Sequence, residues 1–133
     1  MRVVVWRLAR HLRGAAKADL SATSLAALGT IERHGPMTPG QFARHEQIRK
    51  PTATRTVAAL VERELVERTP DPLDGRVVWL QLTPEGRRTL LRVRRRYDAF
   101  LAQRIKRLSA EDRSVLARSA GILEALMEPE AQP

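Results

Sequence analysis

The chain has 133 residues, with 24 Lys and Arg against 15 Asp and Glu, a formal net charge of +9, and no cysteine. This length suits one domain with a modest core, and the charge favours a polyanionic partner, nucleic acid before an anionic membrane surface. The absence of cysteine excludes disulfides, thiolate nucleophiles, Cys-ligated zinc and thiol redox sensing.

The N-terminal segment begins with a charged and then an apolar run. Arg7 and Arg10 interrupt that run within a few residues, so neither a signal peptide nor a membrane span is expected, and the expected location is the cytoplasm. Apolar residues at helical spacing then predict a first helix over residues 2–18.

A second helix is predicted after Ser21, which can cap it, and it should end before Gly35. Gly29 inside this helix costs about 1 kcal/mol relative to alanine, which implies either close packing or a weak helix. A short third helix should begin at Thr38, because Thr38 and Gln41 can form a capping box. Its inward-facing residues are expected to be Phe42 and Ala43.

Pro51 opens a predicted fourth helix that runs to about Glu64. Helical spacing gives it a buried stripe of Ala53, Val57, Leu60 and Val61. The outward face should carry Pro51, Thr52, Arg55, Ala58, Ala59 and Glu62.

Two short extended runs over residues 65–83 flank a turn rich in Pro, Asp and Gly. These residue types supply the backbone conformations or side-chain hydrogen bonds that a reversal needs. The second run alternates, with Val78, Leu80 and Leu82 on one face and Val77, Trp79 and Gln81 on the other. We expect Trp79 to pack beneath the hairpin. An arginine-tipped hairpin after a threonine-rich basic helix predicts a DNA-binding protein.

Two more helices complete the chain. Thr83 begins a long fifth helix to about Leu108, whose apolar stripe requires a partner helix. Six arginines between residues 87 and 96 crowd its first half, which is most typical of a solvated face. Ser109 caps a sixth helix whose apolar residues cover more than one face, so burial on two sides is predicted.

This order of elements resembles the MarR family of winged helix-turn-helix transcription regulators. Residues 71–76, DPLDGR, are similar to the family's wing motif D-x-x-D-x-R, and residues 82–86, LTPEG, are similar to its LTxxG sequence. Residues 51–55 resemble the start of its recognition helix, and residues 65–68 resemble the exit into the wing. The chain departs from the pattern at Glu64, where many members carry glycine, in its short first helix and in a polar turn at residues 45–47.

The resemblance implies a mainly α fold with a small β-hairpin wing, which dimerises through its terminal helices. Residues 1–133 would form a single domain, with a winged helix-turn-helix lobe at about 20–86 and dimerisation helices at about 1–19 and 87–128. The first, fifth and sixth helices would join two copies into a homodimer. Such a dimer would bind a pseudo-palindromic operator in double-stranded DNA, with half-sites about 10 bp apart.

Candidate DNA-binding residues follow from this geometry. Thr52 and Arg55 can present their side chains to base edges, whereas Thr54 and Thr56 suit phosphate or thymine-methyl contacts. Phosphate would also suit the start of the helix. The full candidate set is Thr38, Arg49, Lys50, Thr52, Thr54, Arg55, Thr56 and Arg76. By resemblance, Arg76 enters the minor groove and Asp74 orients the wing by pairing with an arginine.

By resemblance, the function is that of a ligand-responsive transcriptional repressor, or an activator. The family's effectors are small, often aromatic or phenolic, anions, and the candidate ligand-binding residues here are Trp6, Arg10, His11 and Tyr97. No cofactor is expected.

Three alternatives remain. The winged fold could serve protein interaction or RNA binding without operator specificity, and a basic amphipathic protein could rest on anionic membranes. An enzyme is the least supported class, because no nucleophile lies near a paired base and no catalytic residue is proposed. The three histidines, His11, His34 and His45, lack metal-ligand spacing. Asp71 and Asp74 lie in an exposed turn among arginines, which argues against a catalytic carboxylate pair.

Overall fold

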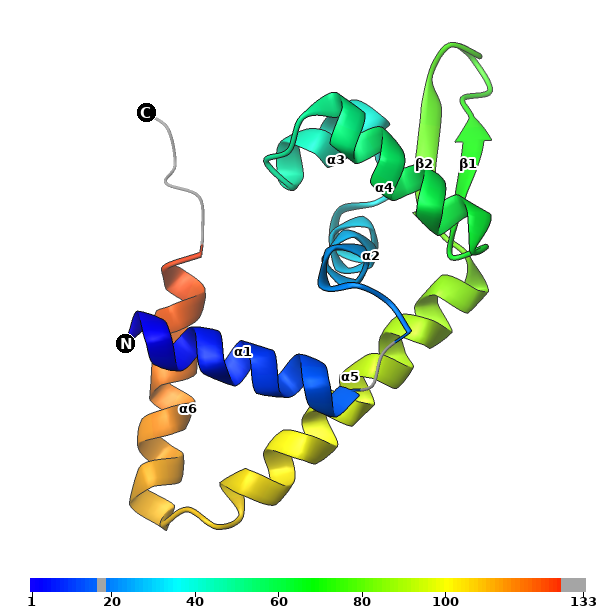
Figure 1. The fold of residues 1–133 in the computed structure, drawn as a ribbon. Helices are drawn as coiled ribbons and strands as arrows, with labels where there is room; N and C mark the ends of the chain where they lie inside the picture. The colour runs from blue at the N-terminus through cyan, green and yellow to red at the C-terminus, as the bar shows by residue number, and fades with distance from the viewer. Residues whose placement is uncertain (17–18, 128–133) are drawn as a thin grey trace, which may run out of the picture. The chain divides into compact units, whose positions relative to one another are not determined.

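The computed structural model describes residues 1–16 and 19–127. The predicted end of the first helix at residue 18, and residue 128 at the end of the predicted dimerisation segment, lie outside these residues. The described part of the chain forms six helices and one hairpin (Figure 1). In chain order they are α1 (Arg2–Ala16), α2 (Ala22–His34), α3 (Pro39–His45), α4 (Lys50–Glu62), β1 (Val66–Pro70), β2 (Val78–Leu82), α5 (Pro84–Ile105) and α6 (Ala110–Ala125).

The chain divides into two compact units, Met1–Tyr97 and Asp98–Pro133. In the first unit, α2, α3, α4 and the hairpin share one hydrophobic core. Its fully buried side chains include Leu28, Ile31, Met37, Phe42, Val57, Leu60, Val66 and Leu80. The predicted inward residues of α3 are buried, and so is the predicted stripe of α4, except that Val61 is half-buried against the core.

The helix starts follow the predicted local chemistry. Ser21 Oγ accepts a hydrogen bond from the Ser24 amide at 3.1 Å. Thr38 Oγ1 accepts from the Gln41 amide at 3.2 Å while the Gln41 side chain accepts from the Thr38 amide at 2.8 Å, which completes the predicted capping box. Each bond satisfies an amide that has no partner within its own helix.

Strands β1 and β2 pair antiparallel, with Val66 opposite Leu82 and Pro70 opposite Val78. Alternation along β2 is visible in its burial, because Leu80 and Leu82 are buried while Trp79 is half-buried. Outside the hairpin, Met37 forms an isolated antiparallel bridge with Leu80, through backbone bonds of 3.1 and 2.7 Å. This bridge ties the segment between α2 and α3 to the hairpin.

The second unit corrects one sequence prediction. No residue of α6 is buried, and its exposed apolar side chains include Val115, Leu116, Ile122 and Leu123. The prediction that this helix is buried on two sides is therefore wrong for the single chain. A lone helix can bury apolar residues on several faces only where other elements cover those faces.

Gly29 in α2 and Glu64 in the turn after α4 are the two positions where the sequence raised a question about glycine. A Cβ built at Gly29 meets nothing within 4 Å, so close packing does not explain this glycine. Glu64, where many family members carry glycine, has φ of 58°, a left-handed conformation that glycine adopts without strain. This chain therefore has glutamate in place of glycine at this turn, but its backbone keeps the conformation that glycine favours.

Candidate nucleic-acid interface

The turn between α3 and α4 is held by backbone and side-chain bonds. Gln47 takes a left-handed φ of 53°, and the Ile48 amide donates to the Ala43 carbonyl at 3.0 Å. Glu46 caps the end of α3, and its carboxylate accepts a hydrogen bond from the Thr30 hydroxyl of α2. The polar residues of this turn therefore fix α3 to α2 and set the direction in which α4 begins.

The first turn of α4 has no side-chain cap. Arg49 is its extended N-cap residue and makes no capping bond, and Pro51 occupies one of the first two helical positions. Both Arg49 and Lys50 are exposed. Unpaired amides, the positive end of the helix dipole and two cationic side chains together form a surface that attracts phosphate.

The outward face of α4 matches its prediction. Pro51, Thr52, Arg55, Ala58, Ala59 and Glu62 are all exposed. Thr54 Oγ1 donates to the Lys50 carbonyl at 2.9 Å, and Thr56 Oγ1 donates to the Thr52 carbonyl at 3.0 Å. Because these two hydroxyl hydrogens are already engaged, a methyl group and acceptor lone pairs are what each threonine can still offer a partner.

Thr38 differs from the other candidates, because its side chain is half-buried and engaged in the capping box. A shallow hollow of about 240 Å³ lies beside it, between the starts of α3 and α4. The hollow is lined by Pro39, Gly40, Lys50, Ala53 and Thr54.

Asp71 organises the tip of the hairpin. Its carboxylate accepts from the Leu73 amide at 2.9 Å, the Asp74 amide at 3.0 Å and the Trp79 indole at 2.8 Å. The indole bond, followed by the two amide bonds, lowers the pKa of Asp71 below its ordinary value. Trp79 thus lies half-buried along the hairpin with its only polar atom satisfied.

Arg76 projects from the tip with 92% of its side chain exposed. Its Nε lies 3.1 Å from Asp74 Oδ1, and the same oxygen accepts from the Arg76 amide at 3.1 Å. The side-chain bond from Arg76 is the main cause that lowers the pKa of Asp74. Asp74 therefore holds both the backbone and the guanidinium of the residue that we expect to meet DNA.

Side-chain hydrogen bonds, one of the two contributions predicted for the turn residues, hold this turn. No glycine among the described residues has a positive φ, and a Cβ at Gly75 meets nothing within 4 Å. The reversal therefore depends on the carboxylates of Asp71 and Asp74 rather than on the conformational freedom of glycine.

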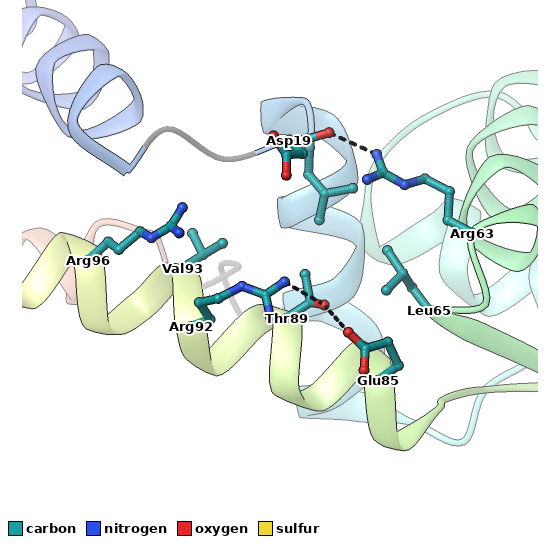
Figure 2. A pocket seen from close by; sticks show the side chains of 9 residues that line it. Asp19, Arg63, Leu65, Glu85, Thr89, Arg92, Val93 and Arg96 are labelled. Atoms are coloured by element: carbon teal, nitrogen blue, oxygen red, sulfur yellow. Dashed lines mark hydrogen bonds between the residues drawn. The ribbon is translucent and has the colours of Figure 1, made fainter.

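A pocket of about 200 Å³ opens within the first unit (Figure 2). It is lined by Asp19, Leu20, Arg63, Leu65, Glu85, Thr89, Arg92, Val93 and Arg96. Arg63 donates to the Asp19 carbonyl at 2.8 Å, while Arg92 donates to Thr89 at 3.3 Å. Three arginines and the two acidic residues Asp19 and Glu85 thus line a pocket that also includes buried Leu65 and Val93.

Sequence reasoning missed this pocket, although one signal was available. Residues 85, 89, 92 and 96 recur at helical spacing, so they share one face of α5. Of the four predicted ligand-binding residues, Trp6 and Arg10 line a different hollow, of about 350 Å³, on α1. His11 and Tyr97 line neither hollow.

The arginines of α5 are exposed, as predicted, but several have partners. Arg94 lies 2.6 Å from the Glu32 carboxylate of α2, and Arg88 lies 2.9 Å from Glu85. The Arg94–Glu32 pair links α5 to α2, whereas the Arg88–Glu85 pair lies within the first turns of α5.

Residues 1–16 and 19–127 hold no group of three or more His, Cys, Asp or Glu side chains that could bind a metal ion. No helix among them is both long and apolar enough to cross a membrane. The rings of His34 and His45 stack with centroids 4.3 Å apart.

Known proteins resemble this chain over most of its length. A model of the MarR family matches residues 20–78. A Mycobacterium bovis protein named as an HTH-type transcriptional regulator is 35% identical over 127 residues, covering 95% of this chain and 89% of that protein. A Pseudomonas aeruginosa structure described as a transcriptional regulator has a TM-score of 0.86 at 30% identity, covering 97% of this chain and 91% of that one. The structure of an S. aureus MepR variant bound to an oligodeoxyribonucleotide shares the fold, with a TM-score of 0.70 at 20% identity and coverage of 96% and 99%.

Proposed function

Because this chain belongs to the MarR family of DNA-binding transcriptional regulators, we propose that it acts as a sequence-specific, ligand-responsive repressor that binds its operator as a homodimer. The observation that carries the DNA-binding part is the α4 surface. Its exposed face presents Thr52 and Arg55, and its uncapped, basic start presents Arg49 and Lys50.

The contacts divide by type. Arg55 and Thr52 read base edges in the major groove, because they lie on the exposed face of α4 near its start. Thr54 and Thr56 offer methyl groups to thymine and oxygen atoms to ordered water. Arg49 and Lys50 contact phosphate, and Arg76 reaches the minor groove from the wing.

The homodimer is supported by apolar side chains that the single chain leaves exposed. On α1 these are Val3, Val4, Val5, Trp6 and Leu8, and on α6 they include Val115, Leu116, Ile122 and Leu123. Several exposed large apolar side chains on each of two helices indicate association with another protein surface. A second copy of this chain would pair such faces and present two recognition helices to a pseudo-palindromic operator.

Ligand response is supported by the pocket in Figure 2. Guanidinium groups around a partly apolar floor suit a small aromatic or phenolic anion. The lining residues come from the segment just before α2, from Arg63 and Leu65 after α4, and from α5. A ligand that binds one arrangement of these elements more tightly shifts the protein toward that arrangement, and so changes its affinity for DNA. The hollow on α1 with Trp6 and Arg10 is the second candidate site.

Selection of bound fragments from the source genome tests the proposal and also yields the operator. Arg55→Ala should weaken operator binding by about tenfold or more and relax the base preference at one position. Arg107→Ala, which removes the same charge in the second unit, is the matched control. A chain that selects no common sequence, or that prefers RNA to duplex DNA at equal salt, would contradict operator binding. Sedimentation of the purified protein tests the dimer separately.

A further inference from the structure

Residues 72–76 form the loop at the tip of the wing, and a backbone hydrogen bond closes this loop where it joins the two strands. The Asp71 amide donates to the Val77 carbonyl at 2.9 Å, which closes the hairpin below residues 72–76. Within that loop, Gly75 has no side chain and open space around it, although its φ is not positive. The fold does not require glycine at this position, but its absence of a side chain keeps the tip narrow.

Leu73 is 99% exposed at this tip, the highest exposure among the exposed large apolar residues of the described chain. Its backbone is fixed, because its amide and that of Asp74 both donate to one carboxylate oxygen of Asp71. A fully exposed leucine side chain buries no apolar surface in the single chain, so it contributes no hydrophobic stabilisation to the fold. Its side chain is available for a partner that meets the tip.

The neighbouring side chains identify that partner. Arg76 projects from the same loop, and its charge is partly balanced by Asp74 of that loop. A short loop held by hydrogen bonds, which exposes the cation of Arg76 beside the apolar side chain of Leu73, matches the minor groove of DNA. There the potential attracts arginine, and apolar side chains enter between or against base steps.

We propose that Leu73 is a specificity-determining residue of the wing, which inserts its side chain into the minor groove beside Arg76 and opens the base step that it meets. This inference rests on the proposed operator binding. Leu73 contributes contact and deformation of the duplex, whereas Arg76 contributes electrostatic attraction. Operator preference at the wing then depends on how easily a base step bends, and on whether a guanine amino group blocks the groove floor.

The test compares wild type, Leu73→Ala, Arg76→Ala and a control, Leu91→Ala, on a duplex selected by the wild-type protein. Leu91 is also exposed, at 48%, but lies on α5. Affinity, its salt dependence and the duplex bend, measured by energy transfer between the ends, are the readouts. Leu73→Ala should weaken binding by about fivefold to thirtyfold and reduce the bend, with the salt slope unchanged because no phosphate contact is lost. Arg76→Ala should flatten the slope.

A second measurement uses operators in which inosine replaces guanine under the wing, which removes the amino group from the minor groove. Wild type should bind these duplexes more tightly than the guanine versions, and Leu73→Ala should lose most of that difference. If wild type binds its operator and Leu73→Ala matches it in affinity, bend and inosine response, the inference is wrong while operator binding stands. A loss that flattens the salt slope as Arg76→Ala does also overturns it. Failure of wild type to bind any duplex overturns both proposals.

Discussion

Gly86, the last residue of the LTPEG sequence, gives a sharp test of how α5 joins the wing. It is buried in the first turn of α5, and a Cβ added there would lie 2.0 Å from the Leu65 carbonyl oxygen and 3.0 Å from the carbonyl carbon. Ordinary carbon–oxygen contacts in proteins are about 3.3 Å or longer. Gly86→Ala therefore requires the backbone of Leu65 or of α5 to move by more than about 1 Å.

The movement is costly because both partners are held by other bonds. The Leu65 amide donates to the Leu60 carbonyl at 2.9 Å, and its own carbonyl accepts from the Thr83 amide at 3.1 Å. The Gly86 amide donates to Thr83 Oγ1 at 3.0 Å. Overpacking costs about 1–3 kcal/mol and more where backbone must shift, against a helix-propensity gain of about 1 kcal/mol for alanine. With the upper end of that cost, about 3 kcal/mol, for a clash that requires a backbone shift, we expect a net loss of about 2 kcal/mol in the free energy of unfolding.

Urea unfolding at one fixed protein concentration, followed by far-UV circular dichroism, measures this change. Gly29→Ala is the matched control, because a Cβ there meets nothing within 4 Å and alanine should add about 1 kcal/mol of stability. If Gly86→Ala is as stable as wild type while Gly29→Ala behaves as expected, the close approach of α5 to Leu65 is wrong.

Three further predictions concern the turn after α4, the wing and the link between α2 and α5. Glu64→Gly should stabilise the fold by about 0.5–1 kcal/mol in urea unfolding, since it relieves a left-handed φ of 58° at some cost in unfolded-state entropy; lower stability would contradict this. The folded pKa of Asp71 is lowered, so its bond to Trp79 stabilises the wing above the ordinary Asp pKa and is lost as pH falls through the lowered value. The indole N–H resonance should therefore change only below about pH 4, and an unchanged resonance in strong acid would argue against the bond. A double-mutant cycle on Glu32 and Arg94, a pair that is one-third to one-half exposed, should give a coupling of about 0.2–1 kcal/mol that shrinks in high salt; a larger, salt-independent value would refute a surface pair.

Local chemistry was sufficient to predict several elements from the sequence. The Thr38 capping box needs only four consecutive residues, so its pattern is readable in the chain. The α4 stripe depends on helical spacing alone, and the wing could be recognised because its turn and alternating strand are contiguous. Each of these features is decided by residues close together in sequence.

Features that depend on distant segments were not predictable. The pocket joins residues from the segment before α2, from the turn after α4 and from α5, and no local pattern indicates that these segments meet. The burial of α6 was predicted wrongly, because the apolar content of a helix indicates that it needs a partner surface but not whether the same chain supplies that surface. The turn was predicted from its Pro, Asp and Gly content, but the residue types did not reveal that two carboxylates hold it while Gly75 has no positive φ.

The backbone of Leu65 links the end of α4 to the start of α5. Its bonds to Leu60 and Thr83 and its close approach to Gly86 involve its backbone atoms, whereas its buried side chain belongs to the core. An apolar substitution that the core accepts would therefore leave the linkage in place. Under the proposed function, substitutions among the side chains that line the pocket would change which ligand it accepts, while this backbone linkage between the end of α4 and the start of α5 stays in place.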